Sequence, residues 1–194
     1  MNDPSTLWNF IADYGDLGAL LPGLCAICVI LCSCGKLREA CVWCGAFAGC
    51  LTLTLLLKIA MGPISIRLSG NGVTITSFPS GHAAMSAMFY LGLAALMRTS
   101  PSRILWAMTA LFFVILTGLI ATAMIALDWH SGAEVAAGLL LGAVFAAFPA
   151  WASRFYTMPP QEAFALGLAA VATIATFHGV RLDTSIDMFR GIPL

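Results

Sequence analysis

Long stretches without a charged side chain constrain this chain more than any other feature of its sequence. A membrane-spanning helix needs roughly 20 consecutive apolar residues to cross about 30 Å of hydrocarbon. Uncharged stretches of about this length cover residues 17–35, 40–57, 104–127, 135–153 and 163–180, and a further one covers about 80–97. We therefore expect an all-α integral membrane protein, folded as a compact bundle of about six transmembrane helices.

Composition and spacing favour one membrane domain over residues 1–194. Only 9% of the residues are charged, against about a quarter in an ordinary globular domain. Basic and acidic residues balance at nine each, so no basic surface indicates nucleic acid as a partner. The connections are short, so we expect a six-span bundle over 17–180 and a C-terminal tail over 181–194.

Residues 1–16 precede the first uncharged stretch and are expected to form an interfacial segment. Their large apolar side chains fall on one side of a short helix, as in helices that lie at a membrane surface; these are Leu7, Trp8, Phe10 and Ile11. Acidic residues occupy the place where a secretory signal peptide carries basic ones, so we do not expect a cleaved signal.

Basic residues in the short connections predict the orientation, because loops rich in Lys and Arg stay in the cytoplasm. One side collects Lys36, Arg38, Arg98, Arg103 and Arg154, and the other collects Lys58, Arg67, Arg181 and Arg190. If Lys58 and Arg67 are retained for chemistry and are not counted, the first side carries the excess of basic residues. We therefore place the termini and the connections 58–82 and 128–134 on the outer face, which in a bacterial plasma membrane is the periplasmic face.

All seven cysteines lie between residues 25 and 50: Cys25, Cys28, Cys32, Cys34, Cys41, Cys44 and Cys50. The close pairs Cys32/Cys34 and Cys41/Cys44 leave a tetrahedral zinc site as an alternative. The favoured interpretation is that they act as small apolar residues in the spans, where small side chains let helices approach. We expect no metal and no cofactor.

Ionisable groups at membrane depth are costly and mark candidate functional sites. Lys58 ends the second uncharged stretch, His82 begins the third, and His130 and Glu134 lie between the fourth and the fifth. Because successive spans alternate in direction, these junctions reach the same side of the membrane. We expect them to share one pocket, which Arg67 reaches from its loop. Lys58 as a helix-end anchor and Glu134 as an interfacial ion-pair partner remain alternatives.

The sequence Pro79-Ser80-Gly81-His82 has the properties of an anion-binding helix start. Ser80 is a preferred N-cap residue, and the N–H groups of the first turn attract anions. Gly81 has no side chain to keep a phosphate oxygen from the backbone. His130 and Glu134 are spaced by one helical turn, so the carboxylate can hold one ring nitrogen and leave the other to attack.

The segments SFPSGHAAMS and HSGAEVAAG, preceded by a lysine that ends an apolar span, resemble the type 2 phosphatidic acid phosphatase superfamily over about residues 50–145. The resemblance implies that Lys58, Ser80 and Gly81 bind phosphate and that His82 is the acid toward the leaving oxygen. It implies that His130 is the nucleophile that becomes phosphohistidine, oriented by Glu134, with no metal.

Two arginines of the family motifs are missing from their expected positions. Where the first motif has Arg-Pro, this chain has Ser65 and Ile66, and where the third has Ser-Arg, it has Ala123 and Met124. Loss of one transition-state donor typically costs about 3–4 kcal/mol.

The resemblance as a whole implies a metal-independent lipid phosphate or polyprenyl diphosphate phosphatase. A head-group phosphotransferase and an inactive lipid-binding or scaffold protein remain alternatives. Membrane lipids are the other expected partners, and the sequence indicates no oligomeric state.

Overall fold

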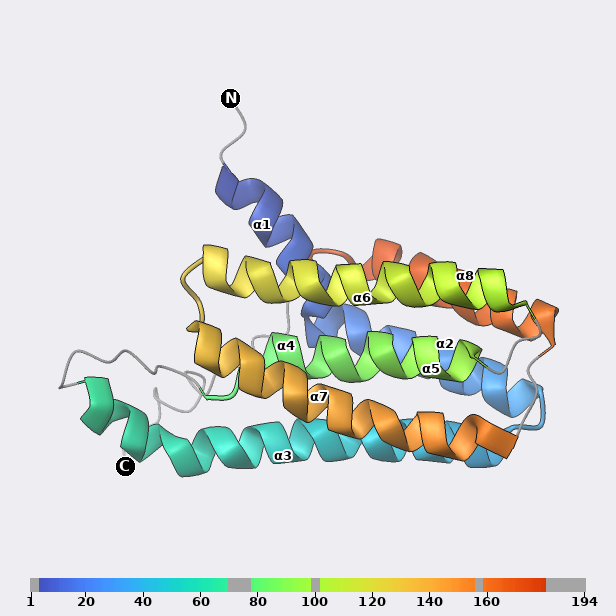
Figure 1. The fold of residues 1–194 in the computed structure, drawn as a ribbon, viewed down its shortest axis with the longest axis horizontal. Helices are drawn as coiled ribbons and strands as arrows, with labels where there is room; N and C mark the ends of the chain where they lie inside the picture. The colour runs from blue at the N-terminus through green and yellow to red at the C-terminus, as the bar shows by residue number, and fades with distance from the viewer. Residues whose placement is uncertain (1–3, 70–77, 99–101, 156–158, 181–194) are drawn as a thin grey trace.

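The computed structural model describes residues 4–69, 78–98, 102–155 and 159–180, and within these ranges every regular element is a helix (Figure 1). The elements are α1 (Pro4–Ala12), η1 (Asp13–Gly15), α2 (Leu17–Ser33), α3 (Leu37–Ser69), α4 (Gly81–Ser86), η2 (Ala87–Leu91), α5 (Gly92–Met97), α6 (Arg103–Ala126), α7 (Gly132–Ala152), η3 (Ser153–Phe155) and α8 (Pro160–Phe177). The predicted C-terminal tail, 181–194, lies outside the described residues.

Each of the six predicted apolar stretches coincides with a helix. Four helical segments are long and apolar enough to cross a membrane: Ser5–Ser33, Leu37–Gly62, Arg103–Ala126 and Gly132–Ala152. The other two, Gly81–Met97 and Phe164–Phe177, are shorter apolar helices. The prediction of an all-α membrane bundle is confirmed.

The centre of the bundle is the helical run α4–η2–α5, which the other helices surround (Figure 1). Most of its side chains are buried, as expected for a helix that is apolar on all sides. Its middle, η2, is a π-helix, and Tyr90 in it donates a 2.7 Å hydrogen bond to the Tyr14 carbonyl of η1. This contact holds η1 against the central helix.

Two glycines bring α7 close to the central helix. A Cβ at Gly138 would lie 2.5 Å from the Ser80 carbonyl oxygen, and one at Gly142 would overlap the Ala84 carbonyl oxygen. Small residues permit such backbone approach between membrane helices. The start of α4 is therefore held beside the start of α7.

Two local predictions differ from the structure. Helix α3 continues from Lys58 to Ser69, so the lysine lies inside a helix rather than at its end. Lysine is a good helix former, so a charge that ends an apolar stretch does not end the helix. The predicted apolar side of α1 is also divided, because Trp8 and Ile11 pack against a cluster that includes Met124, whereas Leu7 and Phe10 are exposed.

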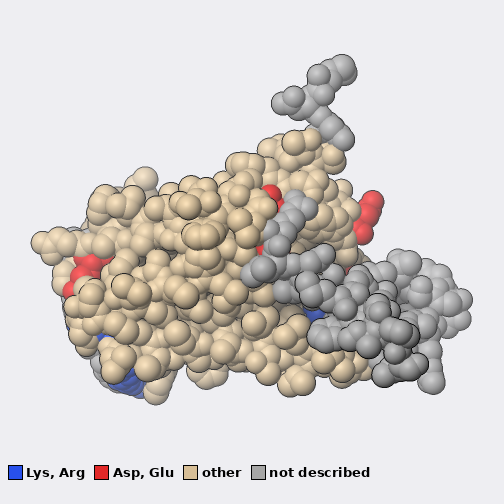
Figure 2. All heavy atoms as spheres, turned by 180° about the vertical axis from the view of Figure 1, so that it is seen from behind, with Lys and Arg blue, Asp and Glu red and all other residues tan. Residues whose placement is uncertain are grey.

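The described surface is mostly uncharged. In Figure 2, tan surface separates the charged atoms at the left-hand end from those near the grey segments. Six cysteines lie on α2 and α3, and Cys34 is the C-cap of α2. The Sγ atoms of Cys28 and Cys44 are 3.3 Å apart. Among the described residues, which include all seven cysteines, no group of three or more His, Cys, Asp or Glu side chains could hold a metal ion.

Candidate functional site

The predicted polar residues meet at one end of the bundle, where α3 ends, α4 begins and α6 connects to α7 (left in Figure 1). A pocket opens there between three segments. Its cavity volume is about 10 Å³, and the empty space rises to about 320 Å³ only when open solvent is included. Its lining is Gly15 from η1, Leu17 from the start of α2, Leu51, Thr54, Leu55 and Lys58 from α3, and Gly81, His82 and Met85 from α4.

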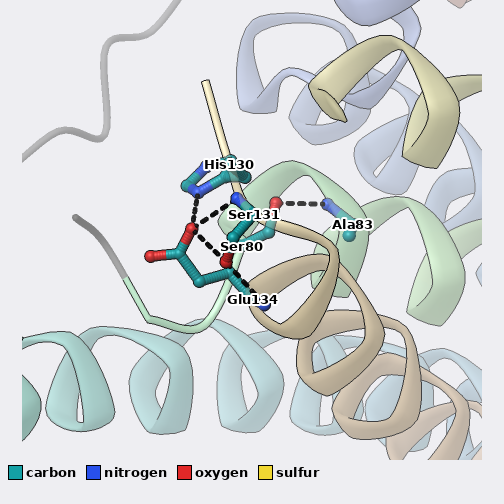
Figure 3. A network of polar contacts seen from close by, with 5 residues as sticks. All are labelled: Ser80, Ala83, His130, Ser131 and Glu134. Carbon is teal, nitrogen blue, oxygen red and sulfur yellow. Dashed lines mark hydrogen bonds and ion pairs between the residues drawn. The ribbon is translucent and has the colours of Figure 1, made fainter. Parts of the chain in front are cut away.

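The Pro-Ser-Gly-His segment forms a capped helix start. Ser80 is the N-cap of α4, and its hydroxyl oxygen accepts a 3.4 Å hydrogen bond from the Ala83 N–H (Figure 3). The Ser80 N–H donates to the Glu134 carbonyl oxygen at 3.0 Å. The cap is thus attached to the first turn of α7, and the glycine and histidine that follow it line the pocket.

A tight turn places His130 before α7. Asp128 has a φ of 54°, in the left-handed region, which few residues other than glycine adopt. The Met124 carbonyl oxygen accepts hydrogen bonds from the N–H groups of Trp129 and His130, at 3.1 and 3.2 Å. These contacts reverse the chain between α6 and α7. Asp128 is exposed in this turn, away from the buried polar contacts.

The Glu134 carboxylate is held by a capping box at the start of α7. Its Oε2 accepts hydrogen bonds from the Ser131 N–H at 2.7 Å and the Ser131 hydroxyl at 3.1 Å (Figure 3). The same oxygen lies 3.5 Å from Nδ1 of His130. This contact is not a hydrogen bond, and Nδ1 is buried without a hydrogen-bond partner among the described residues. The carboxylate therefore acts on the ring chiefly through its charge.

Burial keeps His130 neutral. It is the largest of the effects that lower the pKa of His130 from its ordinary value of 6.5 to about 4, and the positive charge of Lys58 lowers the pKa further. Glu134 opposes both by raising it, and His82 adds a smaller lowering effect. At neutral pH the imidazole is unprotonated and can act as a nucleophile.

His82 has a carboxylate partner that sequence reasoning missed. Its Nε2 lies 3.4 Å from Oδ2 of Asp16, whose side chain is only 4% exposed. The other Asp16 oxygen caps α2 by accepting a 2.7 Å hydrogen bond from the Gly18 N–H. The indole ring of Trp129 lies 6.0 Å from the His82 ring, between centroids. The signal available in the sequence was a carboxylate directly before an apolar stretch.

The remaining predicted residues are placed as follows. Lys58 is 8% exposed and lines the pocket, close enough for its charge to act on His130. Arg67 belongs to the last turns of α3, but its side chain lies outside the part that the structure describes, as does that of Ser65. Met124, at the second vacant arginine position, is fully buried in an apolar cluster.

His178 is engaged elsewhere. Its Nε2 lies 3.1 Å from the Phe10 carbonyl oxygen and 3.8 Å from Asp13 Oδ2. Its ring packs against Phe10 and Tyr14 at centroid distances of 4.2 and 5.1 Å. It thereby joins the end of α8 to the N-terminal segment.

Comparison with known proteins gives one family. A model of the PAP2 superfamily matches residues 44–158. The matched range includes Lys58, the segment 79–82 and the turn 128–134, and it leaves out Asp16. No curated protein and no solved structure matches the chain.

Proposed function

The chain belongs to the PAP2 superfamily, and from this premise we propose that it is a membrane phosphatase acting on a lipid phosphate or polyprenyl diphosphate through a phosphohistidine. The superfamily includes lipid phosphatases. The observation that carries the proposal is the neutral, buried imidazole of His130, which faces a carboxylate and lies within electrostatic range of Lys58 and a second imidazole.

In the first step, His130 attacks the phosphorus. Glu134 faces Nδ1, so its charge favours the tautomer with the proton on Nδ1, and the lone pair on Nε2 attacks. A P–N bond forms while the bond from phosphorus to the leaving oxygen breaks. His82 gives a proton to that oxygen, and Glu134 offsets the positive charge on the phosphorylated ring.

In the second step, water attacks the phosphorus and the P–N bond breaks. His82, now unprotonated, accepts the proton of the water, inorganic phosphate leaves, and His130 returns to its neutral form. Lys58 and the N–H groups at the start of α4, with Ser80 and Gly81, balance the phosphate charge throughout. Phosphoryl transfer depends mostly on such positioning and charge, so the scheme needs no divalent metal.

The test is release of inorganic phosphate from a panel of lipid phosphates and diphosphates by purified protein in detergent with a chelator. Activity should disappear in His130→Ala. His178→Ala is the matched control, because it removes a histidine that contacts Phe10 and Asp13 instead, and it should remain active. Turnover that survives in His130→Ala would reject the phosphohistidine.

Transfer to an alcohol is a second candidate, favoured by Met124. The apolar burial of this side chain leaves no cation at the position where the family motif has its arginine. If an alcohol replaces water in the second step, a new phospholipid forms. Incubation with a labelled lipid phosphodiester and polyols decides, because labelled phosphate without a new lipid excludes transfer. Lipid binding without turnover of any substrate would instead support a binding or scaffold role.

We also propose that the pocket opens to the outer face of a bacterial plasma membrane. The proposal rests on the excess of basic residues at the opposite end, among them Lys36, Arg98 and Arg103. A reporter enzyme that is active only outside the cytoplasm should work when fused after residue 194. Activity of a cytoplasm-specific reporter at the same position would contradict this orientation.

A further inference from the structure

The ion pair between Asp16 and His82 lies outside the mechanism described above. Asp16 comes from the start of α2, before the range that matches the family model. Its carboxylate is almost fully buried and contacts an imidazole that lines the pocket. A buried carboxylate is costly unless charge or hydrogen bonds compensate it, so its position beside His82 calls for a role.

The structure holds Asp16 firmly. Its Oδ1 accepts the Gly18 N–H and so caps α2, which directs Oδ2 toward His82. The preceding element is fixed by the hydrogen bond from Tyr90 to the Tyr14 carbonyl oxygen. At Gly15, a Cβ would lie 2.8 Å from Ile120 Cγ2 and 3.5 Å from the Cβ of His82, so glycine permits the close approach of η1 to α4.

We propose that Asp16 is the positioning residue of the general acid His82, an inference that rests on the proposed phosphatase function. The carboxylate faces Nε2 of the ring at 3.4 Å, so Nδ1 is the nitrogen left to deliver a proton to the leaving oxygen. The other groups near His82 are the Lys58 ammonium, the Trp129 ring and His130.

The test is Asp16→Asn assayed on two esters. Asparagine is a good N-cap residue, so the variant keeps an oxygen for the Gly18 N–H and replaces the oxygen that faces His82 Nε2 with an uncharged NH2 group. Activity on a long-chain alkyl phosphate, whose leaving oxygen needs a proton, should fall about 100-fold, the lower end for general acid catalysis. Activity on nitrophenyl phosphate, whose leaving group departs unprotonated, should stay within about threefold.

Asp13→Asn is the matched control. It makes the same chemical change three residues away, on a carboxylate that faces His178 at 3.8 Å, and should leave the rates on both esters unchanged. Asp16→Glu, which keeps the charge, should recover part of the loss on the alkyl ester.

The outcomes separate two failures. If the wild-type protein hydrolyses both esters and His130→Ala hydrolyses neither, the proposed function stands. An Asp16→Asn variant that then slows both esters equally, or slows neither, overturns the role of Asp16. If the wild-type protein hydrolyses neither ester nor any lipid of the panel, the proposed function fails and the inference with it.

Discussion

Two histidine–carboxylate pairs of different construction lie at this end of the bundle, and of their four residues only His82 lines the pocket. His130 and Glu134 lie one turn apart at the start of α7, whereas Asp16 and His82 come from separate helices. The His130 side chain is 10% exposed and that of His82 is 21% exposed. Burial keeps the first imidazole neutral, which suits a nucleophile, and the more open ring beside the pocket suits proton exchange. We therefore expect the two similar pairs to take different tasks because their surroundings differ.

The largest effects are expected from replacing each of the two histidines, and their comparison tests the division of tasks. His130→Ala should lower the rate at least about 1,000-fold on both an alkyl phosphate and nitrophenyl phosphate, because no covalent intermediate forms. His82→Ala should lose about 100-fold on the alkyl ester and much less on the nitrophenyl ester, because it removes only the acid. Initial rates of phosphate release measure both. The same loss for both variants on both esters would contradict the division of tasks.

Lys58 connects the two pairs, since it lines the pocket with His82 and its charge acts on His130. Lys58→Met should lower the rate about 100-fold by removing a transition-state cation. Burial and the charge of Lys58 together lower the pKa of His130 to about 4. Removing the charge should raise this pKa, so the acid limb of the pH–rate profile should move to higher pH. A pH–rate profile measures this, with Lys58→Arg as the control that keeps a charge. An unmoved acid limb would show that Lys58 does not act on His130.

Glu134→Gln should produce a smaller effect with the opposite shift. Glutamine keeps an oxygen for the Ser131 N–H, so the capping box survives while the charge is lost. We expect a loss of about tenfold, equivalent to about 1.4 kcal/mol of charge stabilisation. Because Glu134 raises the pKa of His130, the acid limb should move to lower pH. A limb that moves the same way as in Lys58→Met would contradict the assignment.

The smallest effect on activity is expected from a substitution at the contact between α7, which carries Glu134, and the central helix, which carries His82. Gly142→Ala would place a Cβ against the Ala84 carbonyl oxygen and 2.7 Å from the Ala87 Cβ. We expect a destabilisation of about 1–3 kcal/mol from overpacking, measured as a lower thermal midpoint in detergent, with activity retained below that midpoint. Gly118→Ala is the control, because its Cβ would meet no atom within 4 Å. Equal midpoints for the two variants would show that α7 does not need this close approach.

Several features were predictable because they are local. The six apolar stretches each became a helix, since the length of an uncharged run is set along the chain. Ser80 caps α4 as its residue type predicts. The contact between His130 and Glu134 follows from their spacing of one turn.

Other features were not predictable because they depend on packing between distant segments. The charge of Lys58 does not show that α3 continues to Ser69. The four apolar residues of α1 do not show which of them face α6, because this depends on where α6 passes. Asp16 gives little sign of its partner, since nothing near it in the sequence identifies His82.

The sequence by itself determined that this chain is a helical membrane protein with a capped Pro-Ser-Gly-His turn and a histidine one turn before a glutamate. These follow from apolar run length and helical spacing, which act within a few turns. Only the tertiary structure decided that Asp16 meets His82 and that His130 is buried beside Lys58. The physical reason is that burial and long-range charge contacts arise only when glycines such as Gly15, Gly138 and Gly142 let separate helices approach.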